Sequence, residues 1–410
     1  MLTDRLYDLA FRFRKTKLWK KLYDSQLFAV KHADGSVGYC CVMGMNGEHL
    51  ALAVYPGKGG MDSYRLLLQS YSVMDDFEHH EMLLSQNCVM CSFEKKDELR
   101  PRDLEKIYKY CDAHHLVLKG RNAYPQFQRF RPHYFPWYLD DEADQMHLLE
   151  GLEACLEVSC ILESTTPEEM GFTGGEPFGR SIPLLEKKDG AYCWSRVSLP
   201  SPLPTVYPSP EVGDDITVAK LNKVKKQGGE WACNVFMHVQ PISNEAREDG
   251  SLEEPINAPF FPYLLVIVDN QSGLVLNMSI SSDPEEYANE FLQTIVESLQ
   301  DNGIPTRILV QNKRTRALFY HLAKHLEMKV LMKKRIPYLD EALDNFFDRF
   351  SDDSDEDELM SGLIGALGEA EQLRKLPDEV MRQLAQAALN GAFPEDIAGS
   401  IRKECQRRGL

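Results

Sequence analysis

The chain has 410 residues, with 46 Lys and Arg against 63 Asp and Glu, so its net charge is −17 at pH 7. Hydrophobic residues make up 43% of it, a globular composition, and at roughly 100–200 residues per domain we expect about two to four domains. No apolar run approaches the ~20 residues of a membrane-spanning helix, and the charged N-terminal segment has no apolar core of a secretory signal. The acidic balance excludes a uniformly basic nucleic-acid coat.

Ten cysteines are scattered over the whole chain. Disulfide frameworks are dense and occur in short secreted chains, so this spread predicts reduced thiols and a cytoplasmic protein. Cys88 and Cys91 form a CxxC within an apolar stretch that is typical of a strand. Because residues three apart on a strand point to opposite faces, we interpret them as two core cysteines rather than a zinc or redox site.

Residues 1–163 are predicted to form an α+β domain around an antiparallel sheet. A basic amphipathic helix opens it, and turn sequences such as Ala33-Asp34-Gly35-Ser36 separate short apolar segments. The predicted strands are at 27–31, 37–43, 49–55 and 87–93, and the predicted helices are at 1–24, 63–70, 75–85, 101–115 and 141–163. A Pro/Gly-rich connection with a hairpin is expected at 164–213.

Cations and aromatic residues alternate at 119–138, between the last two helices of this domain. Arg129 and Arg131 lie among phenylalanines, tyrosines and a tryptophan there. Aromatic faces between cations are what the stacking of single-stranded bases requires. The alternative is a loop whose aromatic side chains fill the core, with arginines at its rim.

Residues 214–350 are predicted to form a second, α/β domain with a mixed sheet. The continuous apolar run at 261–269 is typical of a central strand that is buried on both faces. Its predicted neighbours are a strand at 274–280, a helix at 284–301, a strand at 307–310, a helix at 315–326, a strand at 329–332 and a helix at 338–350. We see two strands before the first long helix, and 230–240 is a candidate third.

This order of elements resembles the catalytic core of the ribonuclease H-like class, in particular integrases and transposases. The resemblance covers about 261–350 and implies a nuclease that uses two Mg²⁺ ions held by carboxylates. Asp269 matches the Asp that ends a strand in that class, and Glu341 or Asp344 on the last helix matches its Glu. Gln311-Asn312 stands where the class has its second Asp. Because an amide is uncharged and holds Mg²⁺ poorly, the resemblance implies a degenerate core.

The strongest basic patch lies between the predicted strand at 307–310 and the last helix of this domain. Its candidate phosphate- or nucleic-acid-binding residues, to which Arg129 and Arg131 of the first domain are added, are Lys313, Arg314, Arg316, Lys333, Lys334 and Arg335. The alternative is a solvated helix face near the acidic linker at 351–358. Beyond that linker, 359–410 is predicted to be a helical tail that docks to a protein partner or to the body of the chain.

A second resemblance covers most of the chain. Residues 18–30, followed by Gly38-Tyr-Cys-Cys-Val-Met-Gly44, are similar to the N-terminal domain of a bacterial family of two-domain proteins, in which a domain like 215–350 follows. It implies two domains of unknown function in a bacterial cytoplasmic protein and assigns no site. We therefore expect a non-catalytic binding or regulatory module. The alternatives are a Mg²⁺-dependent nuclease and a nucleic-acid-binding protein, so whether the chain is an enzyme stays open here.

Overall fold

The structure is a computed structural model. It describes residues 2–45, 47, 49–70, 76–172, 181–242, 257–351, 405, 407 and 408. The predicted acidic linker at 351–358 and helical tail at 359–410 therefore lie almost wholly outside the described residues. The mixture of helices and two separate sheets makes the chain an α+β protein, as predicted. Among the described residues, no helix is long and apolar enough to cross a membrane.

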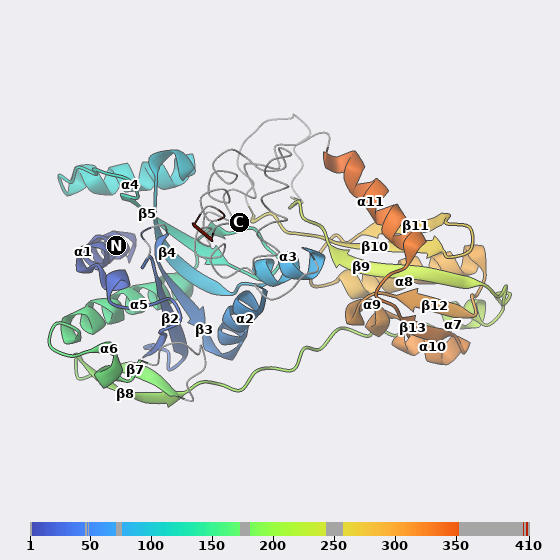
Figure 1. The fold of residues 1–410 in the computed structure, drawn as a ribbon, viewed down its shortest axis with the longest axis horizontal. Helices are drawn as coiled ribbons and strands as arrows, with labels where there is room; N and C mark the ends of the chain where they lie inside the picture. Colours follow the sequence, from blue (N-terminus) through green and yellow to red (C-terminus); the bar gives the residue numbers. More distant parts are fainter. Residues whose placement is uncertain are drawn as a thin grey trace.

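The first domain is built on an eight-stranded sheet with the order β6-β5-β4-β3-β2-β1-β7-β8 (Figure 1). Neighbouring strands are antiparallel except β1 and β7, which are parallel. The strands are β1 Phe28–Lys31, β2 Val37–Met43, β3 Leu50–Pro56, β4 Cys88–Glu94, β5 Tyr124–Phe130, β6 Trp137–Tyr138, β7 Ser181–Lys188 and β8 Ala191–Ser198. The hairpin predicted in the connection is thus β7–β8, and it extends the first sheet because β7 pairs with β1.

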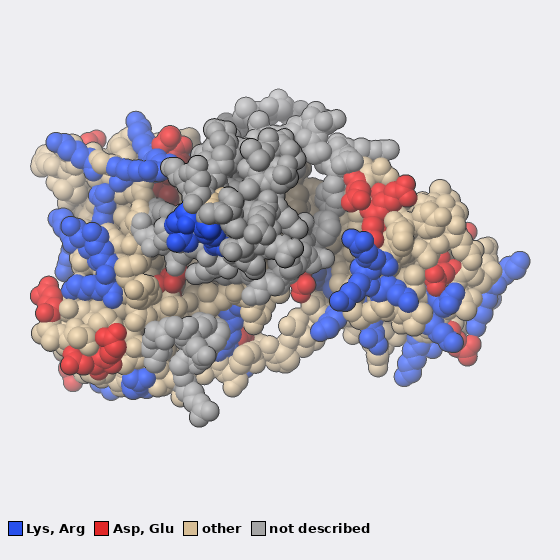
Figure 2. Space-filling view, in the orientation of Figure 1, with Lys and Arg blue, Asp and Glu red and all other residues tan. Residues whose placement is uncertain are grey.

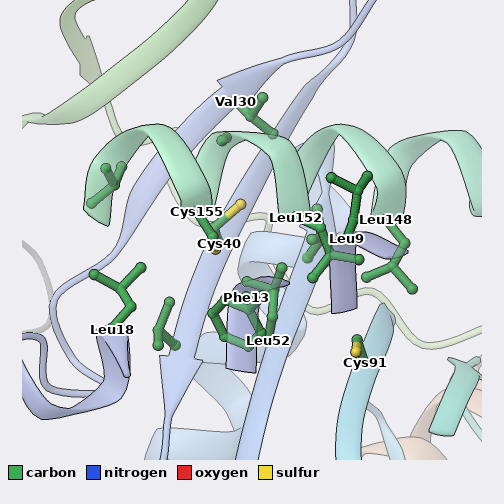
Figure 3. Packing of buried hydrophobic residues seen from close by; sticks show 14 of the residues in the cluster. Leu9, Phe13, Leu18, Val30, Cys40, Leu52, Cys91, Leu148, Leu152 and Cys155 are labelled. Atoms are coloured by element: carbon green, nitrogen blue, oxygen red, sulfur yellow. The ribbon is translucent and has the colours of Figure 1, made fainter. Parts of the chain in front are cut away.

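Helices cover both faces of this sheet. They are α1 Leu2–Thr16, α2 Gly57–Ser70, α3 Asp76–Leu84, α4 Pro101–Ala113, α5 Glu142–Ile161 and the short α6 Pro167–Met170. Figure 3 shows Leu148, Leu152 and Cys155 of α5 packed toward the strands beside Leu9 and Phe13 of α1. The opposite face packs against α2. Successive residues of the central strands therefore contribute to two different cores, which explains why β2, β3 and β4 are almost wholly buried.

The two cysteines of the CxxC lie on opposite faces, as predicted. Cys91 belongs to the core under α1 and α5, and Cys88 belongs to the core under α2. Burial raises the pKa of the Cys88 thiol to about 12, because the charged thiolate loses its hydration there. Both thiols therefore act as small apolar side chains.

The second domain has a five-stranded sheet with the order β11-β10-β9-β12-β13. Its strands are β9 Glu230–Met237, β10 Tyr263–Asp269, β11 Val275–Ile280, β12 Arg307–Val310 and β13 Lys329–Met332. The first three form an antiparallel meander, β12 runs parallel to β9, and β13 runs parallel to β12. The candidate strand at 230–240 is thus confirmed as β9, and three strands rather than two precede the first long helix.

Helices also cover both faces of the second sheet. They are α7 Asp215–Leu221, α8 Tyr287–Asn302, α9 Lys313–Leu318, α10 Tyr320–Leu326 and α11 Pro337–Ser351. The core on one face contains side chains of α7, α8, α9 and α10, whereas the core on the other face contains Leu339 and Leu343 of α11. Because β12 runs parallel to β9 and its last residue is paired with Cys233, the polar residues that follow β12 lie beside the middle of β9.

Candidate functional site

A cluster of amide side chains lies where β9 and β12 run side by side. Val310 at the end of β12 is paired with Cys233, so the next residue, Gln311, comes beside Asn234. Nδ2 of Asn234 donates a hydrogen bond to Oε1 of Gln311 (2.9 Å). Nδ2 of Asn312 donates to Oδ1 of Asn234 and to the backbone carbonyl of Val235, both at 2.7 Å.

The same cluster begins helix α9 and connects to α11. Oδ1 of Asn312 accepts from the backbone N–H of Thr315 (2.8 Å), which caps the N-terminus of α9. Nε2 of Gln311 donates to Oδ1 of Asp340 on α11 (2.5 Å). The other carboxylate oxygen of Asp340 accepts from the backbone N–H of Ile336 (3.2 Å). We call Asn234, Gln311, Asn312, Thr315 and Asp340 the amide cluster.

Among the described residues, the three predicted catalytic candidates do not form a group that could hold a metal ion. Asp269 ends β10, which runs antiparallel to β9, so it lies opposite Trp231 near the start of β9 rather than beside Asn234. Its carboxylate accepts from the backbone N–H groups of Gln271 (2.7 Å) and Ser272 (3.3 Å) in the β10–β11 turn. Glu341 and Asp344 are exposed on α11.

Sequence reasoning missed Asn234 and Asp340. A signal for Asn234 was present, because it is the one polar residue in the apolar run 231–237. Asp340 had no such signal, because acidic residues recur along α11 and only the packing of the helix selects the one that faces Gln311. Among the described residues, no group of three or more His, Cys, Asp or Glu side chains is arranged to hold a metal ion.

A second polar site lies at the junction of the two domains. Arg314 of α9 is 9% exposed and pairs with Glu81 of α3. Its Nη1 donates to Oε2 of Glu81 at 2.6 Å, and its Nη2 donates to Oε1 of the same carboxylate. The predicted phosphate-binding role of Arg314 does not fit this position, since its charge is already bound inside the protein.

Three tyrosine rings surround the Arg314 guanidinium. Its central carbon lies 4.5 Å from the ring centroid of Tyr263, 5.2 Å from that of Tyr207 and 5.9 Å from that of Tyr287. Such cation–π contacts stabilise a cation that is withdrawn from water. Burial alone would lower the pKa of Arg314, but the hydrogen bond and charge of Glu81, together with Tyr263 and Tyr287, raise it, so the guanidinium stays charged. Tyr207 comes from the segment between the domains. The first domain, the second domain and this connecting segment therefore all contribute side chains to the site around Arg314.

Main-chain hydrogen bonds join the domains beside this pair. The N–H of Phe135 donates to the carbonyl of Pro259, and the N–H of Phe261 donates to the carbonyl of His133, both at 2.8 Å. The His133 ring lies against Tyr263, and its Nε2 is 3.3 Å from the Tyr263 hydroxyl. We call these contacts, together with the Arg314–Glu81 pair, the junction.

Family models match both halves of the chain. Residues 4–178 match a domain of unknown function, DUF7309, and residues 217–347 match a second one, DUF6930. The two matches together cover most of the chain. No curated protein and no solved structure matches it significantly. The junction therefore lies between a DUF7309 domain, which contributes Glu81 and His133, and a DUF6930 domain, which contributes Tyr263 and Arg314.

The aromatic stretch of the DUF7309 domain is used within the protein. Phe127 packs against the core of this domain, and Phe135 packs against the core of the DUF6930 domain. Arg129 pairs with Asp144 (2.9 Å) and donates to the carbonyl of Cys88 (3.2 Å), whereas Arg131 is exposed. These contacts favour the core-filling interpretation of this stretch over base stacking.

The remaining predicted cations form a surface on the DUF6930 domain. Figure 2 shows Lys and Arg side chains gathered over the area where α9 and β13 lie, with acidic side chains beside them over α11. All five predicted cations other than Arg314 in this domain are exposed, and we call them the basic surface: Lys313, Arg316, Lys333, Lys334 and Arg335. Within the described part of the chain, none of the five forms an ion pair with an acidic side chain.

Proposed function

We propose that the protein is a non-catalytic binding or regulatory module of the bacterial cytoplasm, whose DUF6930 domain is a degenerate ribonuclease H-like scaffold. The three strands β9, β10 and β11 before α8 support the scaffold, because the class has three strands before its first helix. The nine cysteines other than Cys405 form no disulfide within the described part of the chain, which supports a reducing compartment.

The amide cluster is the observation that carries the non-catalytic proposal. Two-metal phosphodiester cleavage needs several carboxylates around the ions, because their charge holds Mg²⁺ against its hydration shell. The cluster offers three amides and one carboxylate, Asp340, and both oxygens of that carboxylate already accept hydrogen bonds. A connected network of this kind stabilises one arrangement of β9, β12 and α11.

A cleavage assay tests this proposal. Labelled single-stranded DNA, duplex DNA and RNA are incubated with Mg²⁺ or Mn²⁺ and with wild-type protein, Asp340→Asn or Asp269→Ala. We expect the same background in all three samples, because neither carboxylate belongs to a group of described side chains that could hold a metal ion. Metal-dependent cleavage by the wild type that Asp340→Asn or Asp269→Ala abolishes would establish the nuclease alternative instead.

The basic surface favours a second candidate function, the binding of nucleic acid or phosphate groups. Its five cations are exposed and none is neutralised by a described acidic side chain. Unpaired cations on one surface attract phosphates and release the counterions bound to them. The net charge of −17 does not oppose this locally, since surface charges further apart than about 10 Å are screened at moderate salt.

Charge reversal tests the second candidate. Fluorescence anisotropy with a labelled single-stranded oligonucleotide is measured over a salt series for wild type and for Lys333→Glu/Lys334→Glu/Arg335→Glu. We expect at least a tenfold loss of affinity and a shallower salt dependence, by about 0.7 in slope for each phosphate contact removed. The control is Lys220→Glu/Lys223→Glu/Lys225→Glu, which makes the same change in charge at exposed sites around α7. An equal loss in the control would contradict a dedicated surface.

A further inference from the structure

The first domain contains a cavity of about 500 Å³ among α1, the β1–β2 turn, α5 and the β7–β8 hairpin. This volume is in the range of small-molecule sites. Its walls combine two apolar side chains of α5, Met146 and Leu149, with charged side chains from the surrounding elements. The cavity lies in neither the junction nor the DUF6930 domain, so nothing described above accounts for it.

The wall of this cavity contains equal numbers of cations and carboxylates, and the two kinds of charge differ in their exposure to solvent. Three cations stand toward the solvent, since the side chains of Arg5, Lys31 and Lys187 are 53%, 43% and 48% exposed. Three carboxylates lie deeper, and the side chains of Glu150, Glu153 and Glu186 are 16%, 16% and 24% exposed. The mouth is therefore positive and the floor is negative, and the wall as a whole is neutral.

Internal contacts leave part of the polar capacity of this wall unused. Arg5 and Lys187 share the carboxylate of Glu153, and Lys31 donates to Glu186 at 2.6 Å. A guanidinium carries five N–H donors and an ammonium three, so donors remain on all three cations. A carboxylate has about four acceptor positions, and Glu150 uses two of them, for Nδ1 of His32 (2.7 Å) and the N–H of Ala33 (3.1 Å).

His32, which lines the cavity, adds no charge to this balance. His32 is 4% exposed, and burial and the neighbouring His147 lower its pKa, so its imidazole is neutral near pH 7. The hydrogen bond to Glu150 opposes this shift without reversing it. The two rings lie 4.2 Å apart, and Nε2 of His147 is 2.9 Å from Oδ2 of Asp34. Glu150 is thereby held in place by a neutral imidazole and a backbone N–H rather than by a cation.

We propose that this cavity binds a small zwitterion of the α-amino acid type. Its ammonium group would lie toward the carboxylates of Glu150 and Glu186, its carboxylate toward Arg5, Lys31 and Lys187, and its side chain against Met146 and Leu149. A purely anionic ligand would meet the carboxylates of the floor, and a purely cationic ligand would meet the three cations of the mouth. A zwitterion alone matches both layers without burying an uncompensated charge.

Titration with free amino acids tests this inference. Isothermal titration calorimetry and ligand-observed NMR are carried out with a panel of free amino acids, their N-acetyl derivatives and their amides. We expect at least one free amino acid to bind and each blocked form to bind at least tenfold more weakly, since each lacks one of the two charges. Equal binding of an N-acetyl form would mean a simple anion site. That result, or no binding up to about 10 mM ligand, would overturn the proposal.

Two lysines provide a matched pair of variants. Lys31 and Lys188 both pair with Glu186, at 2.6 and 2.9 Å, but only Lys31 lines the cavity. We expect Lys31→Gln to weaken amino acid binding at least tenfold and Lys188→Gln to leave it unchanged, with equal thermal stability of both. Equal loss in the two variants would reject the site. This inference rests on the proposed binding role, but it concerns the DUF7309 domain alone, so its failure is distinguishable from a failure of oligonucleotide binding.

Discussion

Replacing Arg314 by Met is expected to lower the free energy of unfolding by roughly 3 kcal/mol, because the change leaves the Glu81 carboxylate partly buried without its partner. The side chains of the pair are 10% and 22% exposed, so water compensates only a small part of the loss. The change also removes the cation from the rings of Tyr207, Tyr263 and Tyr287. Urea unfolding followed by tryptophan fluorescence measures the effect, since Trp19 and Trp231 are core residues of the first and second domains.

Two further variants separate the ion pair from a general loss of charge. Lys226→Met breaks an exposed pair with Glu327 in the same domain, whose side chains are 63% and 81% exposed, and we expect a change below about 1 kcal/mol. Glu81→Met/Arg314→Met removes both charges, and we expect it to recover much of the stability lost in Arg314→Met. If Arg314→Met loses no more than Lys226→Met, the junction does not depend on this pair.

Local patterns were enough to predict most strands. The turn residues around Asp34-Gly35 and the apolar segments on either side predicted β1 and β2, and the predicted return strand at 37–43 has the bounds of β2, Val37–Met43. The apolar run at 261–269 predicted β10, because a strand that is buried on both faces is apolar at nearly every position. These features depend on neighbours within a few residues, and sequence reasoning is strongest there.

Pairing between distant segments was beyond such patterns. The hairpin β7–β8 was assigned to a connection, because nothing in its residues shows that β7 pairs in parallel with β1 more than 150 residues earlier. Arg314 was assigned to a basic surface for the same reason. Its partner Glu81 is 233 residues away in sequence, and both residues look like ordinary surface charges within their own helices.

The direction of β10 explains why the predicted site at Asp269 and the observed amide cluster lie at different places in the second domain. Asp269 was chosen because it ends an apolar strand, but β10 runs antiparallel to β9, so its last residue lies away from the edge where β12 ends. The residues at that edge come from β9, from the segment after β12 and from α11. Only the strand order brings Asn234, Gln311 and Asp340 together, and this order is a tertiary property.

Two histidines are expected to make the protein sensitive to mild acid: His133 of the junction, and the buried His80, whose ring lies 6.0 Å from that of Phe261. Burial lowers the pKa of His80 to about 4 and that of His133 to about 4, against 6.5 for an exposed imidazole. The groups that face them modify this shift: His79, His238 and Glu81 act on His80, and Glu81 and Arg314 act on His133. Both rings are therefore neutral in the folded protein at neutral pH.

The sign of the pH dependence follows from these values. Above pH 6.5 the imidazoles are neutral in the folded and unfolded states, so the full stability is present. As the pH falls from 6.5 toward 4, the unfolded state takes up protons that the folded state does not, and each histidine costs up to roughly 3 kcal/mol. Urea unfolding at pH 7.5 and pH 4.5 measures the loss. His80→Gln cannot titrate, so we expect a smaller loss than in the wild type, and an identical loss in both proteins would contradict the assignment of acid sensitivity to His80.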